Sequence, residues 1–370
     1  MRIALVVHHE LVGATGAAGS TLTLAEGLRS RGHQVDVVGT EIVGRGPARL
    51  TALRFPSAVA RWMRRAEREG RYDLIDASTG DAARLTRREV SSWRTVLVTR
   101  SHGLEALGVA ARRAGAQRGE LVLRRRYGLY HAGWRLSEVR RSLQVADAVA
   151  VLNDEESSWV CGHADVPPDH VFRTAPLAGR SFNHGEADTT IEFAVLVTGG
   201  LGWRKGSRDA LAALARVIQD YPELRITWLG ANPRDLEFLD ARLASRVTTL
   251  SSVSGEDMVS LYQQHSVLLH LSRFEGFGLT VLEAASHGLS IVATDIAGPR
   301  DIVGEAGILV PVGDVDAVVG SLRELAAPSR RALWGAAAHL ASRRFAPDRV
   351  VTLLESNYQS AIGEKARVRQ

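Results

Sequence analysis

Two glutamates eight residues apart, Glu275 and Glu283, mark the part of the chain with the clearest capacity for chemistry. The glycines of Gly276–Gly278 follow the first glutamate, and apolar residues recur at helical spacing from Leu279. The apolar segment 266–271 comes directly before them and is typical of a short buried strand. The glycines therefore fall at a strand-to-helix turn, which is where a parallel α/β sheet binds its ligand.

A turn of this kind is suited to an anion. Glycine lets the backbone approach a ligand closely, and the first N–H groups of the following helix have no partner inside the helix. Together with the helix dipole, these groups favour a phosphate by roughly 0.3–1 kcal/mol. The neighbouring carboxylates can accept hydrogen bonds from hydroxyl groups. The combination indicates a polyhydroxylated phosphate ester such as a sugar nucleotide; the alternative is an ordinary strand–turn–helix unit with two solvated glutamates.

A second glycine-rich turn, 199–206, carries two adjacent cations, Arg204 and Lys205. A lysine supplies a point charge and an arginine can bind two oxygens at once, so this turn suits a diphosphate. The chain has only two lysines among its 46 basic residues, which makes the lysine at this turn informative. The other, Lys365, lies in a charged C-terminal stretch, and we expect it to have no role.

The pattern Glu-x7-Glu at 275–283 resembles the signature of the family 4 retaining glycosyltransferases of GT-B fold. The resemblance continues through 294–295, 298–301 and 307–310, and it is looser in the N-terminal half of the chain. It implies an α/β protein in which two Rossmann-like domains face each other across a cleft. It also implies transfer of a sugar from a nucleoside diphosphate sugar, with no cofactor and no essential metal.

The resemblance implies a role for each matching residue. Glu275 would hold hydroxyls of the donor sugar, Glu283 would bind the ribose, and Lys205 would neutralise the departing diphosphate. The backbone of Phe277–Thr280 would meet the sugar and the diphosphate. The catalytic candidates are Lys205, Glu275 and His102, and the donor-binding candidates are Gly16, Gly19, Arg204, Gly276, Phe277, Gly278, Leu279, Thr280 and Glu283.

One position departs from the family. Where the family carries the first of its two cations, this chain has Gly200. Arg204 or Arg273 would then have to balance the charge of the diphosphate, and the pattern does not decide between them. The departure also leaves open a catalytically inactive protein that only binds nucleotide sugars.

The glycines of Gly13–Gly19 follow the first predicted strand, 3–7, in a stretch that we predict as a loop. Their spacing is Gly-x-x-Gly-x-x-Gly rather than the Gly-x-Gly-x-x-Gly of a dinucleotide site, and Asp36 lies inside the next strand instead of at its end. Both observations weaken a nicotinamide-dependent oxidoreductase. In GT-B enzymes this loop faces the donor phosphates, so the resemblance makes Gly16 and Gly19 candidates; a loop without ligand contact is the alternative.

Three histidines are expected at one edge of the N-terminal sheet. His102 follows a predicted strand, 95–99, and resembles the family's His-Gly segment on the acceptor side of the site. A histidine there can hydrogen-bond an acceptor hydroxyl, and its ordinary pKa lies near neutral pH. His8 and His9, which end the first strand, are weaker candidates at the same edge.

Two further patterns each have two interpretations. Asp314 and Asp316 form an Asp-x-Asp pair that binds metal in other glycosyltransferases, but their place before a predicted helix favours capping. The stretch Arg112–Arg141 holds nine arginines, two glutamates and three interleaved aromatic residues. It suits either an anionic membrane surface or phosphorylated acceptor, or a solvated helical face. No motif supports nucleic-acid binding.

The elements that must position these residues alternate between short apolar runs and amphipathic stretches, as in parallel α/β sheets. Strands are predicted at 3–7, 34–38, 74–77, 95–99 and 148–152, and, after a linker around 175–189, at 193–197, 225–229, 247–250, 267–271, 290–293 and 307–310. The 370 residues fit two domains. We predict an acceptor domain, 1–178, joined by the C-terminal helix 347–370, and a donor domain, 190–346.

Composition narrows the class of protein. The single cysteine, Cys161, excludes an intrachain disulfide framework and a cysteine-rich metal site. The chain has no apolar run long enough for a transmembrane helix, and its first residues lack a signal-peptide pattern. We therefore expect a cytoplasmic enzyme, with contact to the inner face of the membrane through Arg112–Arg141 as an open alternative.

The predicted function is transfer of a hexose-like sugar to a hydroxyl acceptor, either a cell-envelope glycolipid or polysaccharide or a small natural product. The family implies attack from the face that the leaving group occupies, helped by the leaving phosphate itself. A nucleotide-sugar epimerase of similar fold is the alternative enzyme.

Overall fold

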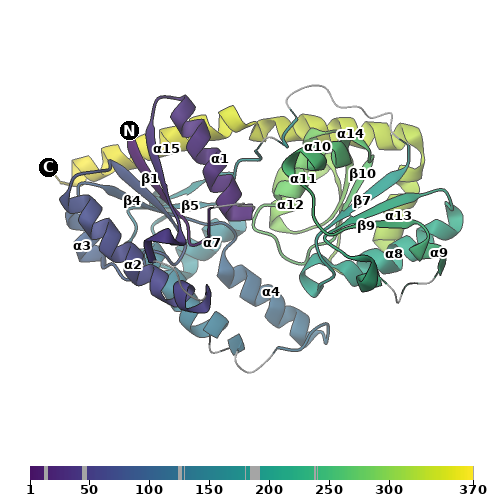
Figure 1. Ribbon diagram of the computed structural model, residues 1–370, viewed down its shortest axis with the longest axis horizontal. Helices are drawn as coiled ribbons and strands as arrows, with labels where there is room; N and C mark the ends of the chain where they lie inside the picture. The colour runs from purple at the N-terminus through teal and green to yellow at the C-terminus, as the bar shows by residue number, and fades with distance from the viewer. Residues whose placement is uncertain are drawn as a thin grey trace. The chain divides into compact units, whose positions relative to one another are not determined.

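The computed structural model describes residues 1–11, 16–43, 48–123, 127–128, 130–179, 181–183, 192–236, 239 and 241–369. These residues fold into two compact units. The N-terminal unit comprises 1–179 and 347–370, and the C-terminal unit comprises 180–346. In both units strands alternate with helices along the chain (Figure 1).

The N-terminal unit is built on six parallel strands in the order β2-β1-β3-β4-β5-β6. These strands are β1 (Arg2–Val6), β2 (Gln34–Val38), β3 (Leu74–Ser78), β4 (Val96–Arg100), β5 (Ala148–Val151) and β6 (Val171–Arg173). Its helices are α1 (Gly16–Ser30), α2 (Ala48–Arg68), α3 (Arg87–Ser92), α4 (Glu105–Gln117), α6 (Leu136–Val145), α7 (Asp154–His163) and α15 (Pro347–Val368), with a π-helical turn at Tyr130–Arg135. Side chains of α1 and α15 share one buried cluster with the sheet, and those of α2, α3, α6 and α7 share another.

The C-terminal unit is built on six parallel strands in the order β12-β11-β10-β7-β8-β9. These strands are β7 (Ala194–Thr198), β8 (Arg225–Leu229), β9 (Val247–Leu250), β10 (Val267–His270), β11 (Ser290–Thr294) and β12 (Ile308–Val310). Its helices are α8 (Ser207–Asp220), α9 (Ala241–Ala244), α10 (Gly255–Gln263), α11 (Leu279–Ser286), α12 (Ala297–Val303), α13 (Val315–Ala326) and α14 (Pro328–Ser342). The central strands β7, β10 and β11 are buried along their whole length, which explains why they read as continuous apolar runs.

In each sheet the chain reverses the direction of strand addition once. The reversal lies between β1 and β3 in the N-terminal unit and between β7 and β10 in the C-terminal unit. The loops at the carboxyl ends of two such strands diverge and leave room for a ligand. Both predicted donor motifs follow the C-terminal pair, Lys205 after β7 and Glu275 after β10, so the topology brings them together.

Every strand that the sequence predicts is present, with its ends shifted by at most one residue. Strand β6 was not predicted, because a three-residue strand at the edge of a sheet leaves too short an apolar run. Helix α1 begins at Gly16, so the prediction of a loop up to Gly19 is wrong. The first turns of α1 bury the small residues Ala18 and Ser20, which give no apolar periodicity that a sequence could reveal.

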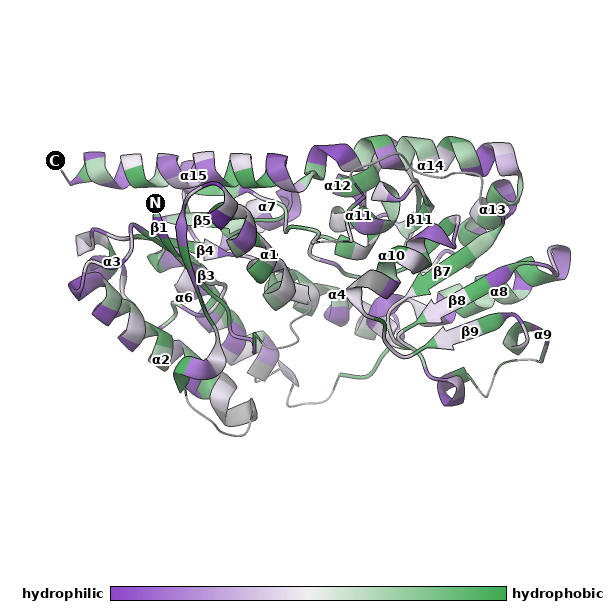
Figure 2. Ribbon diagram, turned by 45° about the horizontal axis from the view of Figure 1, so that its top comes forward, coloured by the Kyte–Doolittle hydropathy of each residue, from purple (hydrophilic) through white to green (hydrophobic). Residues whose placement is uncertain are grey.

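Helix α15 is held on the N-terminal unit by a buried polar cluster as well as by its apolar face. The helix alternates hydrophobic and hydrophilic residues along its length (Figure 2). Arg100 Nη2 donates to the hydroxyl of Tyr358 at 2.7 Å, and Arg100 Nε donates to Asp76 at 3.0 Å. All three side chains are buried, so α15 is fixed to β3 and β4 by groups that have no access to water as an alternative partner.

A second polar cluster lies seven residues further along α15 and involves Lys365. Its ammonium donates to the carbonyl oxygens of Val90 at 3.0 Å and Thr95 at 2.8 Å, and it pairs with the carboxylate of Asp147. The expectation that Lys365 has no role is therefore wrong. Its three ammonium protons have three acceptors, and its role is to anchor the C-terminal helix.

Candidate functional site

The candidate donor site of the C-terminal unit begins with the turn between β7 and α8. Gly206 has φ +64°, and a Cβ at this position would overlap the carbonyl oxygen of Leu271. Leu271 is the first residue after strand β10. The backbone N–H of Arg273 donates to the carbonyl of Arg204 at 2.8 Å. Glycine at 206 therefore lets the two predicted motifs approach each other and join through their backbones.

The stem of Lys205 lies against Gly199. Gly199 has φ +102°, and a Cβ there would lie 2.8 Å from two carbons of the lysine stem. The carbonyl of Gly199 accepts a hydrogen bond from Trp228 Nε1 at 2.9 Å, so the glycine itself is fixed. The turn thus holds the lysine in place by packing its stem, while leaving the ammonium at the ligand edge of the sheet.

Three donors converge on one oxygen of Glu275. Its Oε1 accepts from Lys205 Nζ, from Arg204 Nη1 at 3.1 Å and from Ser272 Oγ at 3.1 Å. Burial alone would raise the pKa of Glu275, but the charge of Lys205, with smaller contributions from His270 and Arg204, lowers it to about 2. Glu275 is therefore a carboxylate at every physiological pH, and it is surrounded by more positive than negative charge.

His270, the last residue of β10, completes this cluster. Its Nε2 lies 3.7 Å from Glu275 Oε1, and neither ring nitrogen has a hydrogen-bond partner among the described residues. Burial lowers the pKa of His270 to about 4, with Glu275 opposing that shift. The imidazole is therefore neutral and can still donate or accept one further hydrogen bond.

The described contacts of the Arg273 side chain lie outside this cluster. Its guanidinium donates to Asp209 at 2.7 Å and lies over the ring of Trp203, 5.7 Å from the ring centroid. Arg204, by contrast, reaches Glu275, and its side chain is 43% exposed. Of the two arginines that the sequence left open, Arg204 is the one that stands beside Lys205.

The second glutamate, Glu283, lies on α11 in a different environment. Ser181 Oγ donates to its Oε1 at 2.6 Å, and the hydroxyl of Tyr262 donates to its Oε2 at 2.8 Å. Burial raises the pKa of Glu283, while both hydroxyl contacts act in the opposite direction. Each carboxylate oxygen can accept a further hydrogen bond, so Glu283 can still bind hydroxyls of a ligand.

The residues between the two glutamates form the start of α11. Gly278 has φ +97° and caps the helix through its backbone, and no side chain caps it. Leu279 and Thr280 are therefore the first helical residues, as predicted. The ring of Phe277 is buried and packs edge-on against Phe345, with the ring centroids 5.3 Å apart.

In the N-terminal unit, Gly16 and Gly19 lie within the first turn of α1 rather than in a loop. Gly16 has φ +59°, and a Cβ there would meet no atom within 4 Å. Gly13 lies outside the described residues. The carbonyl of Gly19 accepts a hydrogen bond from Thr23 Oγ1 at 3.1 Å, within the helix itself.

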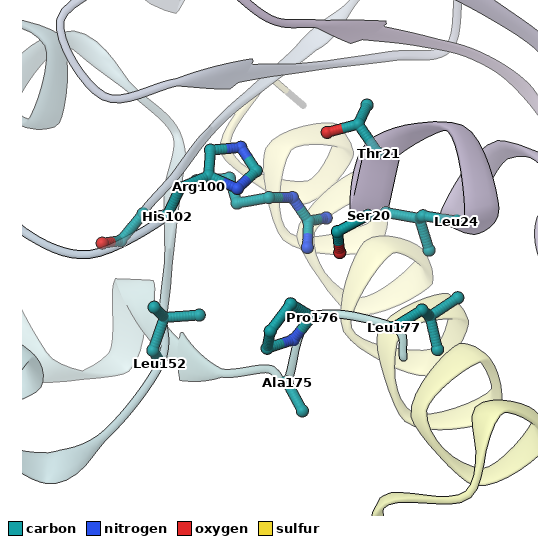
Figure 3. Close-up of a pocket in the computed structure, with 10 residues that line it drawn as sticks. Ser20, Thr21, Leu24, Arg100, His102, Leu152, Ala175, Pro176 and Leu177 are labelled. Atoms are coloured by element: carbon teal, nitrogen blue, oxygen red, sulfur yellow. The ribbon is translucent and has the colours of Figure 1, made fainter. Parts of the chain in front are cut away.

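His102 lines a narrow pocket between α1, the carboxyl ends of β4 and β5, and the segment 175–177. Figure 3 shows the Arg100 side chain extending toward Ser20 of α1, on the opposite side of the pocket from Leu152. Burial, with a smaller contribution from Arg100, lowers the pKa of His102 to about 3. The expectation of a titrating His102 near neutral pH is therefore wrong, and the side chain is a neutral hydrogen-bonding group.

These two units match known proteins along most of the chain. Residues 192–327 match the family described as Glycosyl transferases group 1. Over 348 residues the chain is 26% identical to phosphatidyl-myo-inositol mannosyltransferase from Mycolicibacterium smegmatis, covering 87% of this chain and 84% of that protein. Sucrose-phosphate synthase from Thermosynechococcus elongatus superposes with a TM-score of 0.77 at 19% identity, covering 98% of this chain and 99% of that one. The chain is a glycosyltransferase of the GT-B type.

A further solved structure, the Anabaena protein HepE in complex with UDP and glucose, superposes on this glycosyltransferase with a TM-score of 0.69 at 17% identity. It covers 97% of this chain and 100% of that one. The GT-B fold and the family resemblance that the sequence predicts are confirmed by these comparisons.

The Asp-x-Asp pair of the glycosyltransferase has a structural explanation. The side chain of Asp314 accepts from the backbone N–H of Ala317 at 2.9 Å and caps α13, as predicted, and Asp316 pairs with Arg216 at 2.6 Å. Among the described residues, no group of three or more histidine, cysteine, aspartate or glutamate side chains is arranged to hold a metal ion.

The arginine-rich stretch Arg112–Arg141 is only partly described, and Arg124–Arg126 lie outside the described residues. Within it, the ring of Trp134 is 52% exposed and the guanidinium of Arg84 lies over it, 5.4 Å from the centroid. Val122 is 95% exposed. Across the described part of the chain, no helix has the length and apolar character to span a membrane.

Sequence reasoning missed four residues of the donor site: Ser181, Tyr262, His270 and Ser272. Each reaches a glutamate carboxylate, but none belongs to the motif that located Glu275 and Glu283. His270 and Ser272 flank the end of β10, so the rule that ligands bind at the carboxyl ends of strands could have found them. Nothing in the sequence links Ser181 to α11, 102 residues away.

Proposed function

We propose that this glycosyltransferase moves a hexose-like sugar from a nucleoside diphosphate sugar to a hydroxyl acceptor, with retention of the anomeric configuration and without an essential metal. The observation that carries this proposal is the convergence of Lys205 and Arg204 on Glu275 beside the start of α11, which no side chain caps. It combines a surplus of positive charge, free helical N–H groups and a permanently ionised carboxylate in one place.

The charge of this cluster suits a diphosphate. Two cations surround a single carboxylate, and His270 is neutral, so the cluster carries a net positive charge before any ligand binds. In the proposed role, Lys205 and Arg204 turn from Glu275 to the phosphate oxygens and stabilise the charge that develops as the diphosphate leaves. Arg204 then replaces the cation that the family carries at the position of Gly200.

The two glutamates differ in a way that suits two sets of hydroxyls. Glu275 stays ionised and is 16% exposed, so it can accept hydrogen bonds from the donor sugar. Glu283 already binds two hydroxyl groups, from Ser181 and Tyr262. A ribose presents the same kind of donor, which supports Glu283 as the group that binds the ribose of the nucleotide.

The nature of the donor is supported by the named relatives. One carries mannosyltransferase in its name, and the HepE structure holds UDP and glucose. Both sugars are hexoses. In this proposal the acceptor binds the N-terminal unit, and the acceptor attacks from the face of the sugar that the diphosphate leaves.

The acceptor is either lipid-linked or small and soluble. Exposed Trp134 and Val122 among arginines favour contact with an anionic membrane, because aromatic and basic side chains bind headgroups together. Vesicles of phosphatidylglycerol and phosphatidylcholine test this point: sedimentation of the wild-type protein with anionic vesicles only, weakened in Trp134→Ser, supports a lipid-linked acceptor. Equal recovery in the supernatant with both vesicle types supports a soluble one.

Thermal-shift screening against UDP-, GDP-, ADP- and TDP-sugars, followed by turnover with the sugar that binds, tests the proposed function. We expect one nucleotide sugar to raise the melting temperature and to release its nucleoside diphosphate as the sugar is transferred. Gly200 favours a second candidate, a protein that binds nucleotide sugars without catalysis. Tight binding with neither transfer nor slow hydrolysis would identify that protein.

A further inference from the structure

The buried imidazole of His270, at the end of strand β10, lacks the partners that a buried polar group normally has. Its side chain is 1% exposed, and neither Nδ1 nor Nε2 has a hydrogen-bond partner among the described residues. A polar group in this position loses its hydrogen bonds to water and gains none in return. Because folded proteins rarely leave such groups unpaired, an unpaired imidazole is a candidate for a role in ligand binding or catalysis.

His265 shows how a purely structural histidine of the same unit is held. It is buried and lies just before β10, at the opposite end of that strand from His270. Its Nδ1 lies 2.6 Å from the carbonyl oxygen of Leu261, and its Nε2 lies 2.8 Å from the hydroxyl oxygen of Thr227. Both nitrogens are therefore used. His270 is buried to a similar degree without either kind of contact, so a structural role does not account for its imidazole.

A carboxylate lies just beyond hydrogen-bond reach of this imidazole. Nε2 of His270 is 3.7 Å from Oε1 of Glu275, about 0.5 Å beyond the longest N–H···O hydrogen bonds. That oxygen already accepts from Lys205, Arg204 and Ser272. Because three donors crowd Oε1, the imidazole stands next to the carboxylate without bonding to it. The loss of one donor would open a place for Nε2.

Binding of a diphosphate would remove two of the three donors from Glu275. In the proposed function Lys205 and Arg204 turn to the phosphate oxygens, which leaves Oε1 with the hydroxyl of Ser272 alone. The Glu275 side chain is 16% exposed, so a carboxylate that has lost both cations is costly to keep in this position. It would follow the cations or take up a proton, and either change would disturb its hydrogen bonds to the donor sugar. The site therefore needs a further donor to Glu275 that the diphosphate does not draw away.

We propose that His270 is a positioning residue for Glu275: when the diphosphate draws the two cations away, the imidazole moves onto Oε1 and donates its Nε2–H to it. This inference rests on the proposed function. The described donors all use Oε1, so Oε2 can accept a hydroxyl of the donor sugar at the same time. Burial lowers the pKa of His270 to about 4, so the ring is neutral at physiological pH and is not itself attracted to the diphosphate.

A double-mutant cycle with Lys205→Met tests the contact in the absence of any ligand. In the wild-type background His270→Leu replaces an unpartnered imidazole with an apolar side chain, so we expect a melting temperature no more than about 2 °C below that of wild type. Lys205→Met removes a donor from Oε1 and lets the imidazole approach the carboxylate. In that background we expect His270→Leu to lower the melting temperature by at least about 5 °C. Equal shifts in the two backgrounds would overturn the inference.

Matched substitutions of the two buried histidines test the contact in the loaded enzyme. The readout is the Kd, measured by calorimetry, of the nucleotide sugar that thermal-shift screening selects among UDP-, GDP-, ADP- and TDP-sugars. We expect His270→Leu to raise this Kd by about 10- to 100-fold, because it removes a hydrogen bond to a charged group that exists only in the complex. His265→Leu leaves the carbonyl of Leu261 and the hydroxyl of Thr227 without this partner. It should therefore lower the melting temperature and keep the Kd within about threefold of wild type.

His270→Gln separates the hydrogen bond from the packing of the ring, because its amide nitrogen can take the place of Nε2. We expect its Kd to lie within about fivefold of wild type. A His270→Leu protein that binds the donor as tightly as wild type, or a His270→Gln protein that binds it as weakly as His270→Leu, would overturn the inference while the proposed function stands. A wild-type protein that binds none of the nucleotide sugars would refute the proposed function, and the role of His270 with it.

Discussion

Replacing Lys205 with methionine keeps the apolar stem that packs on Gly199 and removes only the ammonium. In the structure this ammonium binds Glu275, and the two side chains are 20% and 16% exposed. Unit charges about 4 Å apart interact by about 4 kcal/mol at an effective dielectric constant of 20. Because Arg204 remains, the net charge of the cluster falls from positive to neutral, and the diphosphate loses its less exposed cation.

We expect Lys205→Met to lower the rate of nucleoside diphosphate release by about 100- to 1,000-fold, which corresponds to about 3–4 kcal/mol of transition-state stabilisation. Arg204→Met should cost less, about tenfold, because its guanidinium is 43% exposed and solvent screens its charge. The assay measures release of the nucleoside diphosphate from the preferred donor, with donor affinity measured separately by calorimetry.

A double substitution, Asp209→Asn with Arg273→Gln, is the matched control for Lys205→Met. It removes a cation and its partner from the same pair of loops without changing the charge around Glu275. We expect it to keep a rate within tenfold of wild type. A Lys205→Met enzyme that is as active as this control would refute the assignment of Lys205, and a control as inactive as Lys205→Met would show that Arg273 balances the diphosphate.

Three further predictions follow from the same contacts. The pKa of Glu275 is lowered to about 2, so its ion pair with Lys205 stabilises the fold fully above pH 4.5. This stabilisation is lost as the pH falls through 2, because Glu275 is then protonated in the folded protein as well. The melting temperatures of wild type and Lys205→Met should therefore converge between pH 5 and pH 2. Lys365→Met leaves the carboxylate of Asp147 without its cation and should lower the free energy of unfolding, measured in urea, by about 3–5 kcal/mol. Arg367→Met, at an exposed position of α15, should change the free energy of unfolding by less than about 0.5 kcal/mol. The pKa of His102 is lowered to about 3, so its ring resonances in NMR spectra should not shift between pH 5 and pH 8, and a titration midpoint inside that range would contradict the neutral ring.

The sequence was sufficient for the parallel sheets because their strands are buried on both faces and leave continuous apolar runs. Strand β10, for example, is buried along Val267–His270 and was located to within one residue. The start of α1 was missed because Gly16, Ala18 and Ser20 are small, and small residues pack a helix closely without apolar periodicity. Large buried side chains give an apolar periodicity from which a helix can be predicted, and small buried side chains do not.

The candidate site was predictable as two motifs but not as a set of contacts. Glu275 and Lys205 were each found from local spacing, yet their ion pair joins residues 70 positions apart. His8 and Asp81, 73 positions apart, form a pair that no local pattern encodes. Lys365 was misjudged for the same reason, since the acceptors that bury it lie on segments more than 200 residues away.

The most direct test of the account follows the sugar itself. The preferred nucleotide sugar, incubated with the enzyme and glycerol, is observed by proton NMR at the anomeric position. The account predicts loss of the donor signal, release of the nucleoside diphosphate and a glycoside with the same anomeric configuration as the donor. A glycoside of opposite configuration would contradict the retaining transfer, and a donor converted into another nucleotide sugar without any glycoside would contradict transfer altogether.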